Sequence, residues 1–211
     1  MKSTALAIIS LSLALFSAGN AIAKSPGSYL KDIRKHYRKV QTLRAEYREV
    51  FEWAMTGEKN LVEGRLVVTT DNRFRIDNSD QLLVSDGKDI YRWNRTRNQL
   101  VIESIANSEE PLLPQRLLLE FADGFNADSF SDLPVAGRQG GRLDLLPGDP
   151  EASLISAVSL WFTVDDLTIH RMKIVDLNGN FTTYFLSEIQ IDQAVSNSET
   201  SFSPPEGVEI F

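Results

Sequence analysis

The chain contains no cysteine and only two histidines. The lack of cysteine excludes disulfides, thiolate metal sites, a cysteine nucleophile and a lipid anchor built on cysteine. His36 and His170 are far apart in sequence and belong to no catalytic pattern, and the phosphate-loop, zinc-protease and serine-hydrolase motifs are missing. We therefore expect no enzyme, no metal site and no cofactor.

Basic residues are outnumbered, with 22 lysines and arginines against 29 acidic residues and a net charge of −7. Nucleic-acid binding needs clustered basic side chains that neutralise phosphates, so this balance argues against a nucleic-acid partner. The same balance argues against stable electrostatic docking on an anionic membrane.

Long apolar runs are confined to the beginning of the chain. Lys2 precedes an apolar stretch over residues 5–18, and Ala21-Ile22-Ala23 then provides an Ala-x-Ala cleavage site. This order is typical of a secretory signal peptide. We expect residues 1–23 to be removed and residues 24–211 to form one exported domain, because no repeat or linker divides them.

A first helix is predicted after Ser28, which we interpret as its N-cap. Leu30, Ile33, Tyr37 and Val40 recur at helical spacing and form one apolar stripe. The remaining surface of this helix is basic, which is consistent either with solvation or with docking to an acidic partner. Its basic residues are Lys31, Arg34, Lys35, Arg38 and Lys39.

From Leu43 onward the apolar period changes to two, which is typical of β-strands. Residues 124–141 are rich in turn-forming residues, and we expect them to form a loop. The chain is therefore predicted to be a β-dominated α+β protein built around an antiparallel sheet. Strands are expected near residues 43–53, 64–68, 74–76, 82–93, 100–103, 142–146, 159–164, 169–175 and 181–191.

Residues 82–93 are predicted to form a hairpin in which Asp86 and Gly87 make a two-residue type I′ turn. Residues 104–115 then form a loop with two prolines, and residues 115–121 form a short helix that is apolar nearly all round. Such a helix must be buried, either as an ordinary core helix or as a lid over a cavity.

Four stretches carry a family resemblance: residues 42–47, 64–66 followed by Phe74, 83–88 and 202–208. Taken in this order, they resemble the LolA family of periplasmic outer-membrane lipoprotein carriers. The resemblance implies a half-closed antiparallel β-barrel with a helical lid over an apolar cavity. It also implies a periplasmic monomer that is loaded by an inner-membrane ABC transporter of the Lol type and unloaded by an outer-membrane receptor lipoprotein of the LolB type.

Strand alternation and the apolar short helix predict which residues contact acyl chains. Phe74 falls at the position that the family uses near the mouth of its cavity, and we expect Phe74→Glu to impair acyl-chain handling and leave the fold intact. The predicted cavity residues are Leu66, Val68, Phe74, Ile76, Leu82, Val84, Tyr91 and Trp93 from the strands, with Leu117, Leu118 and Phe121 from the lid.

The chain departs from the family pattern at two positions. Thr70 stands where the best-known members have an arginine that fastens the lid, and a threonine cannot supply that array of donors. Glu49 replaces the usual glutamine. Two alternatives to lipoprotein transport stay open on the same fold: a carrier or sensor of another amphiphile, and a periplasmic regulatory module that binds a protein.

Overall fold

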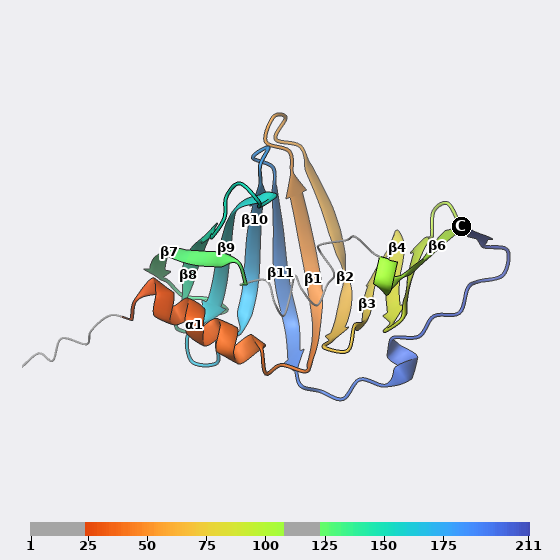
Figure 1. Cartoon of the computed structure of the whole chain (residues 1–211), viewed down its shortest axis with the longest axis horizontal. Coiled ribbons are helices and arrows are strands. Elements are labelled where there is room, and N and C mark those ends of the chain that lie inside the picture. The colour runs from red at the N-terminus through yellow and green to blue at the C-terminus, as the bar shows by residue number, and fades with distance from the viewer. Residues whose placement is uncertain (1–23, 108–122) are drawn as a thin grey trace, which may run out of the picture.

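The structure is a computed structural model that describes residues 24–107 and 123–211. The predicted signal peptide and the lid residues Leu117, Leu118 and Phe121 lie outside the described residues. The described part consists mostly of strands, which form one large curved sheet with a single α-helix against it (Figure 1). The prediction of a β-dominated α+β fold is confirmed, and the sheet is open rather than a closed barrel.

The strands follow the order β12-β6-β5-β4-β3-β2-β1-β11-β10-β9-β8-β7 across the sheet. Neighbouring strands are antiparallel except that β12 pairs parallel with β6. The elements are α1 (Pro26–Tyr37), β1 (Thr42–Glu52), β2 (Lys59–Thr69), β3 (Arg73–Asn78), β4 (Gln81–Asp86), β5 (Asp89–Asn94), β6 (Gln99–Ser104), η1 (Ile105–Asn107), β7 (Phe125–Asp132), β8 (Gly140–Pro147), β9 (Ile155–Thr163), β10 (Ile169–Asp176), β11 (Phe181–Ile191), η2 (Asn197–Glu199) and β12 (Glu209–Ile210).

Helix α1 begins three residues earlier than the sequence suggested. Ser25 is the N-cap, its side chain accepts a hydrogen bond from the Ser28 backbone N–H, and Pro26 follows in the first turn. Proline suits this turn because its missing N–H would have no helical partner there. The predicted stripe of Leu30, Ile33, Tyr37 and Val40 is buried, although Val40 lies beyond the end of the helix at Tyr37.

The face of the sheet that α1 covers is called the inner face, and the opposite side the outer face. The ring of Tyr29 stacks on Phe130 at 4.1 Å and meets Phe162 edge-on at 5.6 Å. The Tyr37 hydroxyl accepts the Ile169 backbone N–H at 3.0 Å. These contacts fix α1 across β7–β10, so one half of the inner face is closed by the helix (Figure 1).

The hairpin at residues 82–93 forms, but its predicted two-residue turn is wrong. Ser85 pairs with Ile90, so four residues, from Asp86 to Asp89, separate the last pair of the ladder, and Gly87 and Lys88 lie between β4 and β5. A type I′ turn needs positive φ at both central positions, and of Asp86 and Gly87 only Gly87 has one, at 97°. The Asp86 carboxylate instead accepts the backbone N–H groups of Lys88 and Asp89, which stabilises the longer loop.

The segment 124–141, expected to be a loop, contains strand β7 and the beginning of β8. Strand β7 lies at one edge of the sheet and pairs only with β8 along its length. Its polar sequence, with Asp128 and Asp132, conceals the strand pattern. Charged residues on an edge strand discourage pairing with another chain, so this composition suits its position.

Candidate functional site

Four of the predicted cavity residues lie together on the inner face. Leu66 pairs with Ile76, and Val68 pairs with Phe74, across the adjacent strands β2 and β3. Val68 and Phe74 are fully buried, Leu66 is buried and Ile76 is half-buried. They pack in one apolar cluster with the α1 residues Leu30 and Ile33.

The other four strand residues, Leu82, Val84, Tyr91 and Trp93, are on the outer face, so the prediction of one common lining is wrong. Phe74 pairs with Ser85 and Ile76 pairs with Leu83, which makes the odd-numbered residues of β4 the inner ones. Side chains alternate along a strand, so Leu82 and Val84 point the opposite way. Their partners Trp93 and Tyr91 share that outer side.

Sequence reasoning missed Leu83 and Ile90 as inner-face residues. The feature that could have identified them is the turn between β3 and β4. There the Asn78 side-chain oxygen accepts hydrogen bonds from the backbone N–H groups of Asp80 and Gln81. A two-residue loop at Ser79-Asp80 sets the register between these strands. The alternation in β3 then determines which face of β4 is the inner one.

The outer aromatic side of the hairpin is covered by the end of the chain, residues 192–211, here called the C-terminal strap. The Phe202 ring lies 5.8 Å from Tyr91 and 6.1 Å from Trp93, measured between ring centroids. The Asn98 side-chain amide donates to the Gly207 carbonyl at 2.9 Å, and β12 pairs with β6. The aromatic face therefore anchors the strap.

Thr70 lies in the turn between β2 and β3 and is exposed. Its backbone N–H donates to the Gln41 carbonyl at 3.1 Å, and its hydroxyl is 3.3 Å from the Gln41 side-chain oxygen. These contacts place Thr70 near the C-terminal end of α1. The lid it was expected to hold lies outside the described residues, so the weakened latch stays a prediction.

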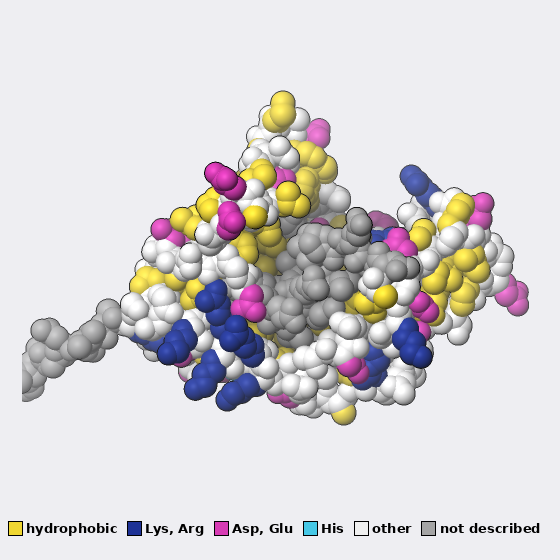
Figure 2. Space-filling model, viewed as in Figure 1, with side chains coloured by type: hydrophobic (Ala, Val, Ile, Leu, Met, Phe, Trp, Pro, Cys, Tyr) yellow, Lys and Arg dark blue, Asp and Glu magenta, His cyan; other side chains and the backbone are white. Residues whose placement is uncertain are grey.

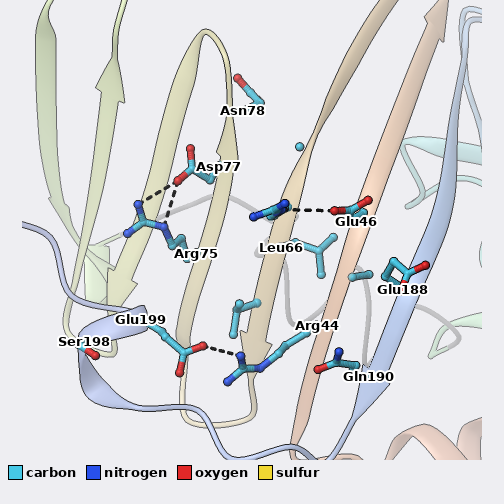
Figure 3. A pocket seen from close by; sticks show the side chains of 14 residues that line it. Arg44, Glu46, Leu66, Arg75, Asp77, Asn78, Glu188, Gln190, Ser198 and Glu199 are labelled. Carbon is cyan, nitrogen blue, oxygen red and sulfur yellow. Dashed lines mark hydrogen bonds and ion pairs between the residues drawn. The ribbon is translucent and has the colours of Figure 1, made fainter.

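A pocket of about 840 Å³ lies on the outer face, between β1–β3 and the strap (Figure 3). Its lining includes two ion pairs: Arg44 reaches Glu199 of the strap at 2.6 Å, and Arg75 reaches Asp77 at 2.9 Å. An acyl chain placed here would remove water from charged groups without replacing their hydration. This pocket is therefore distinct from the predicted apolar cavity, four of whose predicted strand residues lie on the inner face.

Polar groups interrupt the inner face midway along β1. Glu49 pairs with Tyr184 of β11 and with Val62 of β2. Burial raises the pKa of the Glu49 carboxyl, and burial followed by the nearby Glu49 charge raises the pKa of Tyr184. The Tyr47 hydroxyl accepts a hydrogen bond from the Asn78 amide at 3.1 Å. The inner face thus carries a carboxyl group that burial drives toward its neutral form.

Glu49→Gln is expected to stabilise the protein at neutral and alkaline pH. A buried acid with a raised pKa lowers the free energy of unfolding as pH rises above its ordinary range, and glutamine removes that penalty. We expect Tm to rise by about 2–4 °C near pH 8, the shift that about 1 kcal/mol produces in a chain of this size. The difference should vanish below about pH 4, where the glutamate is protonated in both states.

Thermal unfolding over this pH range measures the effect. Glu206→Gln removes the same charge from an exposed position and serves as the control. Equal shifts in the two variants would attribute the gain to net charge and contradict the burial argument.

Within residues 24–107 and 123–211, no group of three acidic or histidine side chains is arranged to hold a metal ion. Over the same residues, α1 and the two short 3₁₀ helices lack the length and apolar character needed to cross a bilayer.

The amino-acid sequence matches a known protein family. The family model for outer membrane lipoprotein carrier protein LolA matches residues 38–203. An outer-membrane lipoprotein carrier protein from Methylobacillus flagellatus is 25% identical over 190 residues, covering 86% of this chain and 87% of the relative.

Solved structures of low sequence identity show a likeness to this chain. A conserved protein from Thermus thermophilus has a TM-score of 0.55 at 13% identity, over 86% of this chain and 97% of that one. A LolA superfamily protein from Nitrosomonas europaea has a TM-score of 0.42 at 8% identity, over 85% of this chain and 99% of that one. Because the family model spans well over half of the sequence, the chain belongs to the LolA family of outer-membrane lipoprotein carriers.

Proposed function

We propose that this protein carries lipoproteins across the periplasm and shields their acyl chains against the inner face of its sheet. In this proposal an inner-membrane ABC transporter of the Lol type loads the carrier, and an outer-membrane receptor of the LolB type unloads it. Family membership supports the cargo class. The observation that carries the proposal is the apolar cluster on the inner face of β1–β4, which includes Leu66, Val68, Phe74 and Ile76.

Simple physical chemistry explains why such a cargo needs a carrier. Burial of one methylene group is worth about 0.8 kcal/mol, so a single fatty acyl chain strongly resists exposure to water. A lipoprotein that leaves one membrane for another must keep these chains covered throughout. An apolar sheet face provides that cover without forming a covalent bond, and transport then requires binding and release but no catalysis.

Leu83→Asn is expected to weaken lipoprotein carriage, because it places an amide on the half-buried part of the inner face. An unpaired polar group against an apolar ligand costs about 1–3 kcal/mol, which corresponds to roughly a fivefold or greater loss of binding. The measurement is release of a radiolabelled lipoprotein from spheroplasts, with and without the added protein.

Val67→Asn provides the matched control, since Val67 is also half-buried but lies on the outer face, next to the polar pocket. We expect this variant to release lipoprotein as the natural protein does. If the natural protein releases none, the transport proposal fails. If both variants are equally active, transport stands and the inner face is not where the acyl chains bind.

A further inference from the structure

Three hairpins end together at one end of the sheet, here called the hairpin end. Glu52 pairs with Lys59 on one side and with Phe181 on the other, and Asp176 pairs with Ile155. The β1–β2, β10–β11 and β8–β9 turns are therefore adjacent, and Figure 1 shows them at the top of the sheet. Helix α1 lies at the opposite end.

The hairpin end is unusually apolar for an exposed surface. Large side chains stand in solvent on all three turns and along the adjoining strand, and Figure 2 shows the apolar colour reaching the tip of the molecule. Four other large hydrophobic residues of the described chain are exposed. Leu146 is also near this end, whereas Ile102 on β6, Ile210 on β12 and Phe211 are not. The exposed fractions at the hairpin end are 97% for Met55, 73% for Leu154, 61% for Leu177, 56% for Leu61 and 42% for Trp53.

These side chains are held outward by ordered turns. The Asp176 carboxylate accepts the backbone N–H groups of Asn178 and Asn180, which fixes the turn that presents Leu177. The Asn180 side chain accepts the Ala54 backbone N–H at 3.1 Å and so joins this turn to the β1–β2 turn. A group of large apolar side chains exposed on one surface marks a contact surface.

Beyond Glu49, the inner face of β1 ends in an aromatic pair beside this end. Phe51 alternates with Tyr47 and Glu49 along β1 and therefore points to the inner side. The Trp53 ring meets Phe51 edge-on at 4.5 Å. A surface that covers the hairpin end would therefore also contact the Phe51 and Trp53 rings at the end of the inner face.

We propose that the hairpin end inserts into the interfacial region of a zwitterionic lipid membrane. The exposed apolar side chains come from three turns, and a fluid interface adapts to each of them better than a rigid protein surface that must match all three. Tryptophan prefers the level of the lipid headgroups, where its ring and its N–H are both accommodated. This inference goes beyond cargo transport, because the docking itself needs no lipoprotein.

The charges around the hairpin end favour a neutral membrane over an anionic one. Acidic residues flank the tips, including Glu58, Asp149 and Glu151, all of them exposed. They would be repelled by an anionic surface and tolerated by a neutral one. The basic side chains of α1 are at the far end of the sheet, and Figure 2 shows them gathered there. An anionic membrane would therefore attract α1 rather than the hairpin end.

The test uses the mature protein and phosphatidylcholine vesicles, with Trp53 as the reporter. Trp93→Phe and Trp161→Phe remove the other two tryptophans. We expect Trp53 fluorescence to shift to the blue with these vesicles and to be quenched by brominated lipid. Met55→Asp with Leu177→Asp should reduce vesicle partitioning at least tenfold, as the loss of two inserted apolar side chains predicts.

The control is Ile210→Asp with Phe211→Asp, which adds the same charge at exposed apolar positions away from the hairpin end. This variant should partition as the parent protein does. The proposal is overturned if the parent does not bind phosphatidylcholine, or if both pairs of substitutions reduce binding equally. It is also overturned if binding requires an equal mixture with phosphatidylglycerol and is lost in Lys31→Glu/Lys35→Glu, since α1 would then be the docking surface.

Discussion

Gly64→Ala is expected to destabilise the protein by about 2–3 kcal/mol, although the change adds one methyl group. Gly64 lies between Tyr47 of β1 and Asn78 of β3 in the middle of the sheet. A Cβ atom at this position would collide with the Asp77 carbonyl oxygen and lie 3.0 Å from both the Tyr47 ring and the Asn78 Cβ. The Asp77 oxygen belongs to the backbone, so the clash cannot be relieved by a side-chain rotation.

The surrounding contacts make this position rigid. Asn78 donates to the Tyr47 hydroxyl and caps the following turn, and the Arg95 side chain holds both the Asp77 carboxylate and the Asn78 carbonyl. A shift of β3 would strain all of these bonds together. We expect Tm to fall by roughly 4–12 °C, using 2–4 °C for each kcal/mol.

Gly27→Ala is the control for Gly64→Ala, because a Cβ at Gly27 meets nothing within 4 Å and alanine favours the helix. That variant should unfold at or slightly above the Tm of the natural protein. A Gly64→Ala variant that unfolds within a degree of the natural protein would show that β2 and β3 separate easily here, against the contacts described.

Strand alternation was sufficient to predict the inner residues of β2 and β3, because both strands are buried on one side. It failed for the hairpin at 82–93 because β4 carries apolar or buried side chains on both faces. Leu82 and Val84 lie on the outer face, and Leu83 and Ser85 lie on the inner face. Alternation assigns the side chains of such a strand to two faces, but it does not show which of these faces is the inner one.

The strap itself could not be located from its own residues. Phe202 is surrounded in sequence by serine and proline, and its contacts with Tyr91 and Trp93 span more than a hundred residues. Tertiary packing of this kind has no local signal. The N-cap was wrongly placed at Ser28, although Pro26 marks the first turn of the helix and is a local signal for Ser25.

Phe74→Glu is expected to have the largest effect of the variants considered, and the expectation that it leaves the fold intact is corrected by the structure. Phe74 is fully buried between Val68 and Ser85, which are themselves fully buried. Removal of a core phenylalanine alone costs about 3–5 kcal/mol. A carboxylate in its place must also lose its hydration without a charged partner.

The combined loss should therefore exceed about 4 kcal/mol, a large part of the roughly 5–15 kcal/mol that stabilises a typical domain. The variant should be largely unfolded or aggregated at growth temperature, and it should recover part of its stability at acidic pH, where the glutamate is neutral. Chemical denaturation at two pH values measures both effects. Phe211→Glu makes the same substitution at an exposed phenylalanine and should leave the free energy of unfolding nearly unchanged. A Phe74→Glu protein as stable as the natural one would mean that position 74 opens to solvent, and only then could it test acyl-chain binding directly.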